Sequence, residues 1–232
     1  GFFTQSAPDV DQRTRYTLRL ALADGERILR DTDIEYEVFP ALPALREVQV
    51  SVIGTGKAQQ LVRELGGKLD AKTPSVFLVD DYATYVRRRR DIDRAVAAGA
   101  RAVFLELPVG EYEIGGSMVR VVECVMRARE FVSRATGHRL VTGFEPEDFK
   151  CWYDPKAGYF RPLLATVFDA DGWQPILTNG NGIWGTTAWK KTFAAAEKPS
   201  GSGAYIICQI ALAGRTRHNP AAGIFARRLL ER

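Results

Sequence analysis

Three short apolar runs decide the fold: EVQVSVIG at residues 47–54, SVFLV at 75–79 and AVFLEL at 102–107. Each has the length and β-branched or aromatic content of a buried strand, and the runs recur about every 27 residues. Between them lie KAQQLVRELGG at 57–67 and ATYVRRRRDIDRAVAAGA at 83–100, which both show helical spacing of apolar residues. This alternation predicts a parallel sheet whose strands are connected by right-handed crossovers.

The second predicted helix contains the basic run Arg87–Arg90, followed by Asp91 and Asp93. Because charges of both signs alternate there, we interpret the run as a solvated helix face rather than a phosphate site. The apolar side of this helix is expected to consist of Tyr85, Val86, Ile92 and Val96.

Beyond the third strand the pattern becomes antiparallel. EYEIGGSMVRVVE at 111–123 favours a hairpin around two glycines, although 118–132 also fits a helix. Further strands are expected at 163–168, 173–178, 192–198 and 204–212, with a glycine-rich loop, TNGNGIWG, at 178–185. A final helix should run from Pro220 to Leu230, because proline favours a first helical turn. Its core-facing positions would be Ala221, Ile224, Phe225 and Leu229.

The first 40 residues read differently. Apolar residues alternate from Tyr16 to Leu22 and again from Ile34 to Val38, on either side of an Asp24–Gly25 turn, which predicts one β-hairpin. Because a two-stranded hairpin is marginal in water, we interpret residues 1–45 as the end of an Ig-like β-sandwich plus a proline-containing linker. Residues 46–232 would then form the α/β domain. A hairpin packed on the following domain is the alternative.

Composition limits the classes of protein. The chain has 232 residues, 46% hydrophobic and 26% charged, and a net charge of +4, as in an ordinary globular protein with no general basic character for nucleic acid. We expect a soluble chain, since no segment has the roughly 20 apolar residues of a membrane helix and no signal segment stands at the start. The three cysteines show no CxxC spacing and do not define a compartment.

Ligands of open α/β sheets bind beyond the carboxyl ends of the strands, which draws attention to GTGK at 54–57, to Asp80 and Asp81, and to the stretch from Glu106 to Glu113. GTGK lacks the remaining glycine of a dinucleotide fingerprint, since Gln59 stands there, and it favours a tight turn. The carboxylates of Asp80, Asp81 and Glu106 do not separate into an acid and a nucleophile for glycoside hydrolysis.

Cysteine and histidine chemistry has little support in the sequence. Cys208 lies in a continuous apolar strand, which favours a buried thiol over a nucleophile. His218 starts a helix with no carboxylate close in sequence, and His138 is expected at the surface in the turn ATGH. A metal cluster or a cysteine–histidine pair is therefore poorly supported, and we expect no cofactor.

The order of these segments resembles the C-terminal region of bacterial family 2 glycoside hydrolases of the β-galactosidase and β-mannosidase type. The segments are LELPVGEYEIGG at 105–116, FVSRATGHRLVTGFEPEDFKCWYD at 131–154, ILTNGNGIWG at 176–185, and AAAEK to ARRLL at 194–230. The resemblance covers nearly the whole chain. It implies a β-sandwich followed by a flavodoxin-like domain similar to class I glutamine amidotransferases and generally non-catalytic.

The resemblance also gives meaning to two departures. Active amidotransferases carry a cysteine on the elbow after the third strand and a later His-Pro-Glu segment. Here Glu106, Leu107 and Pro108 occupy the elbow, and His218 is followed by Asn219 and Pro220. Amidotransferase chemistry is therefore not expected, and no catalytic residue is carried over, since the family's catalytic groups belong to a (β/α)₈ barrel that this chain lacks.

Three functions remain open at this point. The first is structural support of the catalytic barrel or of a homo-oligomer, with Trp152, Trp173 and Trp189 as core or interface aromatics. The second is carbohydrate binding, in which Trp184 stacks on a sugar while Asn179 or Asn181 bonds to hydroxyls. The third is a freestanding nucleotide-binding protein that uses GTGK. The expected partners are the other domains of the parent glycosidase, in a bacterial cytoplasmic or exported protein; neither nucleic acid nor a membrane is expected.

Overall fold

The computed structural model describes residues 6–54, 56–69, 71–182 and 186–231. The chain divides into two compact units, Gly1–Pro43 and Ala44–Arg232. Among the described helices, none is long and apolar enough to cross a membrane.

The first unit is the predicted hairpin, made of β1 (Thr14–Asp24) and β2 (Arg27–Val38) in antiparallel register. Gly25 sits in the connecting turn with φ of 59°, a backbone conformation that glycine adopts without strain. The register pairs Tyr16 with Tyr36 and Leu18 with Ile34, so the apolar residues of both strands share one face.

The two faces of this hairpin differ sharply. One carries ion pairs between the strands, in which Arg15 lies 2.9 Å from Glu37 and Arg19 bonds to Asp31. The other carries aliphatic side chains that stay open to solvent, with Leu22 63% and Ile34 46% exposed. Within the described residues, β1 and β2 pair only with each other. The hairpin is therefore an amphipathic two-stranded sheet.

The second unit is built on a mixed sheet of nine strands in the order β3-β4-β5-β13-β12-β10-β7-β6, with β11 paired to β12. The parallel part consists of β3 (Val50–Ile53), β4 (Val76–Val79), β5 (Arg101–Leu105) and β13 (Gly203–Cys208). The antiparallel part consists of β6 (Gly110–Ile114), β7 (Ser117–Glu123), β10 (Thr166–Ala170), β11 (Gln174–Gly182) and β12 (Trp189–Ser200). The predicted strand–helix alternation and the hairpin at 111–123 are both confirmed.

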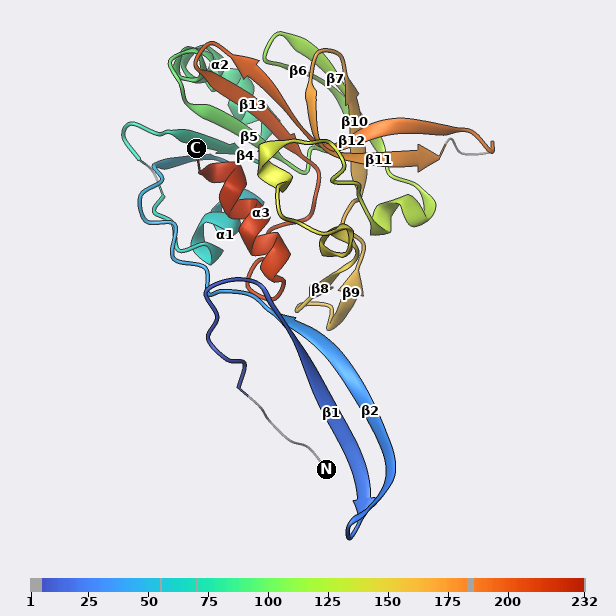
Figure 1. The fold of residues 1–232 in the computed structure, drawn as a ribbon. Helices are drawn as coiled ribbons and strands as arrows, with labels where there is room; N and C mark the ends of the chain where they lie inside the picture. The colour runs from blue at the N-terminus through green and yellow to red at the C-terminus, as the bar shows by residue number, and fades with distance from the viewer. Residues whose placement is uncertain (1–5, 55, 70, 183–185, 232) are drawn as a thin grey trace. The chain divides into compact units, whose positions relative to one another are not determined.

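Helices cover both faces of the parallel strands (Figure 1). Helices α1 (Lys57–Glu64) and α3 (Pro220–Leu230) pack into one apolar cluster, together with Val103 and Leu105 of β5. Helix α2 (Tyr82–Ala97) packs into a second apolar cluster on the opposite face of the sheet, together with Phe104 of β5, which lies between Val103 and Leu105 in the sequence. Because side chains alternate across a strand, the continuous apolar run of β5 supplies both layers of the core.

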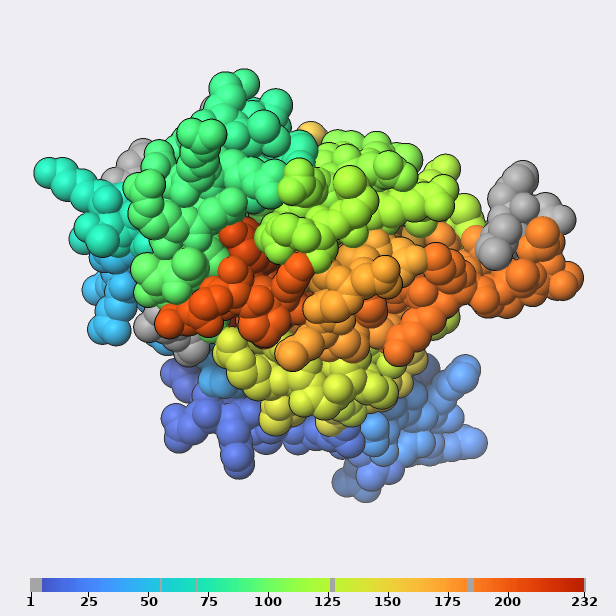
Figure 2. Space-filling model, turned by 90° about the horizontal axis from the view of Figure 1, so that it is seen from above, coloured from blue at the N-terminus to red at the C-terminus, as the bar shows by residue number. Residues whose placement is uncertain are grey.

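The apolar side of α2 is narrower than predicted. Tyr85, Ile92 and Val96 are fully buried, but Val86 is 49% exposed, because it lies next to Tyr85 on a helix that turns about 100° per residue. The prediction of a solvated arginine face is confirmed for Arg87, Arg88 and Arg90, which are exposed. Arg89 is half-buried and lies 3.4 Å from Asp93 and 2.8 Å from Glu113. Figure 2 shows the α2 surface beside the β6–β7 hairpin.

The segment between β7 and β10 consists of short elements. Three 3-10 helices, η1 (Met126–Glu130), η2 (Arg139–Val141) and η3 (Pro146–Phe149), are followed by a small hairpin of β8 (Trp152–Asp154) and β9 (Tyr159–Arg161). The prediction of a glycine-rich loop at 178–185 is wrong for its first five residues. Thr178 to Gly182 continue β11 and pair with β12 from Phe193 to Trp189, and 183–185 lie outside the described residues. Backbone pairing accommodates the glycines there because the partner strand supplies the hydrogen bonds.

Candidate functional site

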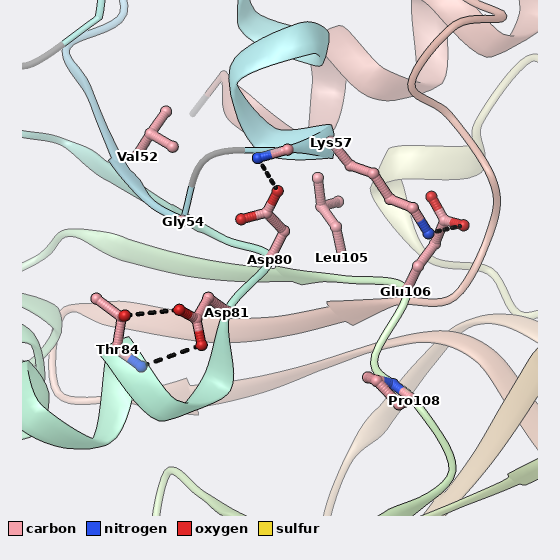
Figure 3. A pocket seen from close by; sticks show the side chains of 10 residues that line it. Val52, Gly54, Lys57, Asp80, Asp81, Thr84, Leu105, Glu106 and Pro108 are labelled. Carbon is pink, nitrogen blue, oxygen red and sulfur yellow. Dashed lines mark hydrogen bonds and ion pairs between the residues drawn. The ribbon is translucent and has the colours of Figure 1, made fainter.

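A cavity of about 610 Å³ lies at the carboxyl ends of β3, β4 and β5. It is the edge at which open α/β sheets bind ligands. Figure 3 shows its three turns: Gly54 to Lys57 after β3, Asp80 and Asp81 after β4, and Glu106 after β5. The sequence analysis selected all three, and the structure brings them together.

The turn after β3 is organised by a carboxylate rather than by a ligand. The Asp80 carboxylate accepts the backbone N–H of Gly56 at 3.1 Å and of Ala58 at 2.9 Å, at the start of α1. Gly54 has φ of 133°, and a Cβ there would fall on an Asp80 carboxylate oxygen, so only glycine fits. Asp80 thus occupies amides that a phosphate would need, which supports the tight-turn interpretation of GTGK.

The neighbouring Asp81 also has a structural role. It caps α2 by accepting the backbone N–H of Thr84 at 3.2 Å and the Thr84 hydroxyl at 2.7 Å. These bonds hold the pKa of the Asp81 carboxyl below its usual range. Asp81 is therefore engaged in capping α2, whereas Asp80 uses one carboxylate oxygen for the turn of α1 and keeps the other buried, with no hydrogen-bond partner among the described residues.

Glu106 is the one described residue other than glycine with a left-handed backbone, at φ of 45°. Its backbone N–H donates to the Cys208 carbonyl at 2.9 Å, and its carboxylate accepts from the Lys57 ammonium at 2.7 Å. Burial raises the pKa of the Glu106 carboxyl, and Lys57 opposes that shift. This strained position after a central strand is where a nucleophile elbow would present its cysteine or serine.

The backbone N–H and carbonyl of Leu107, the residue after the elbow, are both bonded to a buried side chain. Gln209, 1% exposed, accepts the Leu107 N–H at 2.7 Å and donates to the Leu107 carbonyl at 3.0 Å. In an acyl-transfer elbow the corresponding N–H stabilises the oxyanion of the intermediate. Here that donor is already satisfied inside the protein.

Two of the three thiols, Cys124 and Cys208, are buried. Cys208 is fully buried, as predicted, and burial raises the pKa of its thiol to about 12, far above that of a catalytic thiol. Burial likewise raises the pKa of Cys124 to about 11. In the described part of the chain, no group of three or more His, Cys, Asp or Glu side chains is arranged to hold a metal ion.

The prediction that His138 lies at the surface is wrong. Its side chain is 9% exposed, and its Nε2 lies 2.9 Å from the Glu197 carboxylate. The turn ATGH folds back because the His138 Nδ1 accepts the N–H of Leu140 and begins η2. His218, by contrast, is exposed next to α3.

The predicted carbohydrate-binding residues divide into two groups. Trp184 lies outside the described residues. Asn179 and Asn181 are 5% and 6% exposed on β11. The Asn179 amide donates to the carbonyls of Ala128 and Phe131 at 2.7 and 3.0 Å. Asn181 bonds to backbone groups of residues 123 and 125, so it ties β11 to the segment before η1, while Asn179 ties β11 to η1 and to the residue after it. Sugar binding by these three residues stays a prediction.

The remaining tryptophans of the prediction also separate. Trp152 and Trp173 are buried, at 4% and 6% exposure, whereas Trp189 at the start of β12 is 62% exposed. The sequence analysis missed two residues of the strand-end site. Lys57 was noticed only as part of GTGK, and Gln209 carried a signal as the polar residue inside the apolar run IICQIAL.

Comparisons with known proteins give distant similarities. No protein-family model matches the chain, and no curated protein matches it. Among solved structures it is similar to the cytoplasmic protein STM3548 of Salmonella typhimurium, with a TM-score of 0.45 and 10% identity over 93% of this chain and 94% of that one.

Two β-galactosidases are similar at the same level. For a cold-adapted enzyme from Rahnella sp. R3 the TM-score is 0.46, with 12% identity over 80% of this chain and 32% of that one. For an enzyme from Bacillus circulans sp. alkalophilus the TM-score is 0.43, with 11% identity over 80% of this chain and 30% of that one. The chain spans about a third of the length of these two enzymes. Similarities of this size assign neither a family nor an activity.

Proposed function

We propose that this chain is a non-catalytic accessory region of a multidomain glycoside hydrolase of the family 2 type. In this proposal residues 1–45 are the end of an Ig-like β-sandwich plus a linker, and residues 46–232 are a flavodoxin-like, amidotransferase-like domain that supports the assembly of the catalytic barrel. The proposal starts from the segments that resemble that family.

The strand-end elbow is the observation that carries the proposal. A carboxylate held by Lys57 at 2.7 Å replaces the nucleophile at Glu106. Gln209 occupies the N–H of Leu107, which an oxyanion would need. Both changes act on the same reaction, since acyl transfer requires the nucleophile and the oxyanion donor together. A domain with this elbow retains the scaffold of the enzyme class and lacks its reaction centre.

The amphipathic hairpin gives independent support to the multidomain part of the proposal. Its apolar face has the alternation of a strand pair that packs on a second sheet, as β-sandwich strands do. Its opposite face is charged and bridged by ion pairs such as Arg15–Glu37.

The mass of the native polypeptide tests the proposal. An antibody raised against this chain is used to purify the native polypeptide from source cells, and the eluate is assayed on chromogenic β-galactosides and β-mannosides. We expect a polypeptide several times heavier than the 25.8 kDa of this chain, and glycosidase activity that elutes with it. A native band at 25.8 kDa, or a heavy band with no glycosidase activity, would contradict the proposal.

Carbohydrate binding is the second candidate. It rests on Trp184 together with Asn179 and Asn181, and replacement of Trp184 by alanine should abolish retention of the chain by polysaccharide in affinity electrophoresis without lowering its melting temperature. Trp189→Ala is the matched control, because Trp189 is an exposed tryptophan on the adjacent strand. Unchanged migration of the Trp184 variant would count against this candidate.

The freestanding nucleotide-binding protein is the least supported alternative. Because Asp80 occupies the N–H groups of Gly56 and Ala58, we expect nucleotides to leave the melting temperature unchanged. A concentration-dependent rise with a nucleotide would revive this alternative.

A further inference from the structure

A second cavity, of about 350 Å³, is lined by charged side chains from three separate segments. Helix α1 contributes Gln60 and Glu64, the turn between β8 and β9 contributes Asp154 and Lys156, and residues 213–218 after β13 close it. Neither the glycosidase resemblance nor the strand-end elbow uses this cavity.

The carboxylates of this cavity are engaged in bonds within the protein. Glu64 accepts the backbone N–H of Gly214 at 2.8 Å, the Thr216 hydroxyl at 2.7 Å and the Gln60 amide at 2.8 Å. These bonds fix the segment 213–218 against α1. Both carboxylate oxygens of Glu64 therefore already accept hydrogen bonds, from the backbone of Gly214 and from the hydroxyl of Thr216.

Asp154 is held in the same way by cations. Its carboxylate lies 3.6 Å from the guanidinium of Arg161 and 3.6 Å from that of Arg215. Arg215 is itself buried, and its guanidinium donates to the Pro162 carbonyl at 2.8 Å. Asp154 thus has its charge compensated by two guanidinium groups, and the carboxylate oxygens of Glu64 are occupied by neutral donors before any ligand arrives.

Three basic side chains of the cavity lack such compensation. Lys156, Arg217 and His218 are exposed, and within the described residues none of them lies within ion-pair distance of a carboxylate. Arg217 makes a single long contact, from its Nε to the Glu64 carbonyl at 3.5 Å, which leaves its two terminal nitrogens for other acceptors. The cavity therefore presents an excess of hydrogen-bond donors and positive charge.

The imidazole of His218 is placed by its neighbours. The Tyr153 ring lies 6.2 Å away between centroids, and the backbone of Tyr153 is bonded on both sides to the Asn219 amide, at 2.9 and 2.8 Å. Asn219 is buried and begins α3. A donor that packing already holds in place loses less entropy when it binds a ligand.

We propose that this cavity binds a small ligand through an oxyanion group, a carboxylate or a phosphate ester, held by Arg217, Lys156 and His218. An arginine matches the two oxygens of such a group with two parallel bonds, and lysine adds a point charge. The site goes beyond the accessory role proposed above and does not depend on it.

Titration followed by NMR of the imidazole nitrogens tests the site. The chain has two histidines, so His138, buried against Glu197, serves as the internal reference for His218. The full chain at low ionic strength is titrated separately with inorganic phosphate and with glucuronate. We expect a saturable shift of the His218 resonances with at least one of them, with half-saturation below about 10 mM, and a constant His138 signal.

Variants separate a built site from general charge attraction. Arg217→Ala should weaken binding about tenfold and Arg217→Lys less, because lysine keeps the charge and loses the fork of donors. Arg90→Ala is the matched control, because Arg90 is an exposed arginine of α2 that does not line this cavity, and it should leave binding unchanged.

Each outcome decides something. Saturation by phosphate only, glucuronate only, or both supports the site and identifies the phosphate ester, the carboxylate, or the shared oxyanion as its ligand. No saturation with either ion, a shift of both histidines together, or equal weakening by Arg217→Ala and Arg90→Ala would overturn the proposal. The native mass and glycosidase activity are unaffected by any of these results, so the two proposals fail separately.

Discussion

The two units of the chain differ in strand pattern and in burial. In the α/β unit, β5 is buried along its whole length, and Phe104 is packed against α2. In the hairpin, apolar and polar residues alternate, and Ile34 on β2 is 46% exposed. A continuous apolar strand is typical of a sheet covered on both faces, and an alternating strand of a sheet with one apolar face. A strand pattern alone specifies which residues would be buried, and packing partners decide whether they are.

The largest effect that tests this contrast is loss of a core aromatic. Phe104→Ala should lower the free energy of unfolding by about 3–5 kcal/mol, because it leaves a cavity between α2 and the sheet. Ile34→Ala in the hairpin is the control, with an expected change within about 0.5 kcal/mol. Urea unfolding measures both variants, with tryptophan fluorescence reporting on the α/β unit, where all four tryptophans lie beyond residue 150, and far-UV circular dichroism reporting on the strands of both units. Equal losses for the two variants would remove the contrast.

The closed elbow gives the next effect. Gln209→Leu should destabilise the α/β unit by about 1–3 kcal/mol, because the N–H and carbonyl of Leu107 lose their buried partners. Gln60→Leu replaces an exposed glutamine of α1 and should lower the free energy of unfolding by less than about 0.5 kcal/mol. If Gln209→Leu behaves like Gln60→Leu in urea unfolding, the Leu107 donor is not closed off by this side chain.

A smaller effect should appear as a pH dependence. Burial raises the pKa of the Glu106 carboxyl in the folded state, so the native state binds this proton more tightly than the unfolded chain does. The associated stability is complete below the unfolded pKa and is lost as pH rises through the folded pKa. Between acid and neutral pH, wild type should therefore lose stability relative to Glu106→Gln.

Glu111→Gln provides the control for this pH series, because Glu111 is exposed on β6. Both variants are compared with wild type by urea unfolding at several pH values. A pH-independent difference between wild type and Glu106→Gln would show that burial of Glu106 has no energetic consequence.

The smallest effect is expected from removing the hairpin. For a chain that starts at Ala44, the free energy of unfolding of the α/β unit should agree with that in the full chain within about 0.5 kcal/mol. The reason is that the α/β unit contains its own two-sided core. A loss of more than about 2 kcal/mol would mean that the hairpin stabilises the α/β unit, which is the alternative left open by its sequence.

Local patterns made much of the fold predictable. The apolar runs around Val50, Phe77 and Phe104 specified buried parallel strands, because continuous burial needs no alternation. The glycines of 178–185 misled for the opposite reason: strand pairing with β12 is a long-range effect that outweighs the local preference for a loop. His138 was misplaced because its partner Glu197 is distant in sequence.

The candidate site was predictable in position and not in chemistry. Strand ends are visible in the sequence, so Asp80, Asp81 and Glu106 were selected correctly as neighbours. Asp80 bonds to the turn of α1, and Gln209 after β13 bonds to Leu107 after the neighbouring strand β5. Both bonds depend on side-chain contacts between segments far apart in the chain. No spacing rule contains this information.

Hydrogen exchange of the full chain, read by mass spectrometry of peptides, tests the central claim that the α/β unit has a core on both faces of its sheet, whereas the hairpin unit has no such core of its own among its described residues. We expect amides of β4 and β5 to exchange only through global unfolding, and those of β1 and β2 to exchange orders of magnitude faster. Equal protection of the hairpin and the central strands would contradict it.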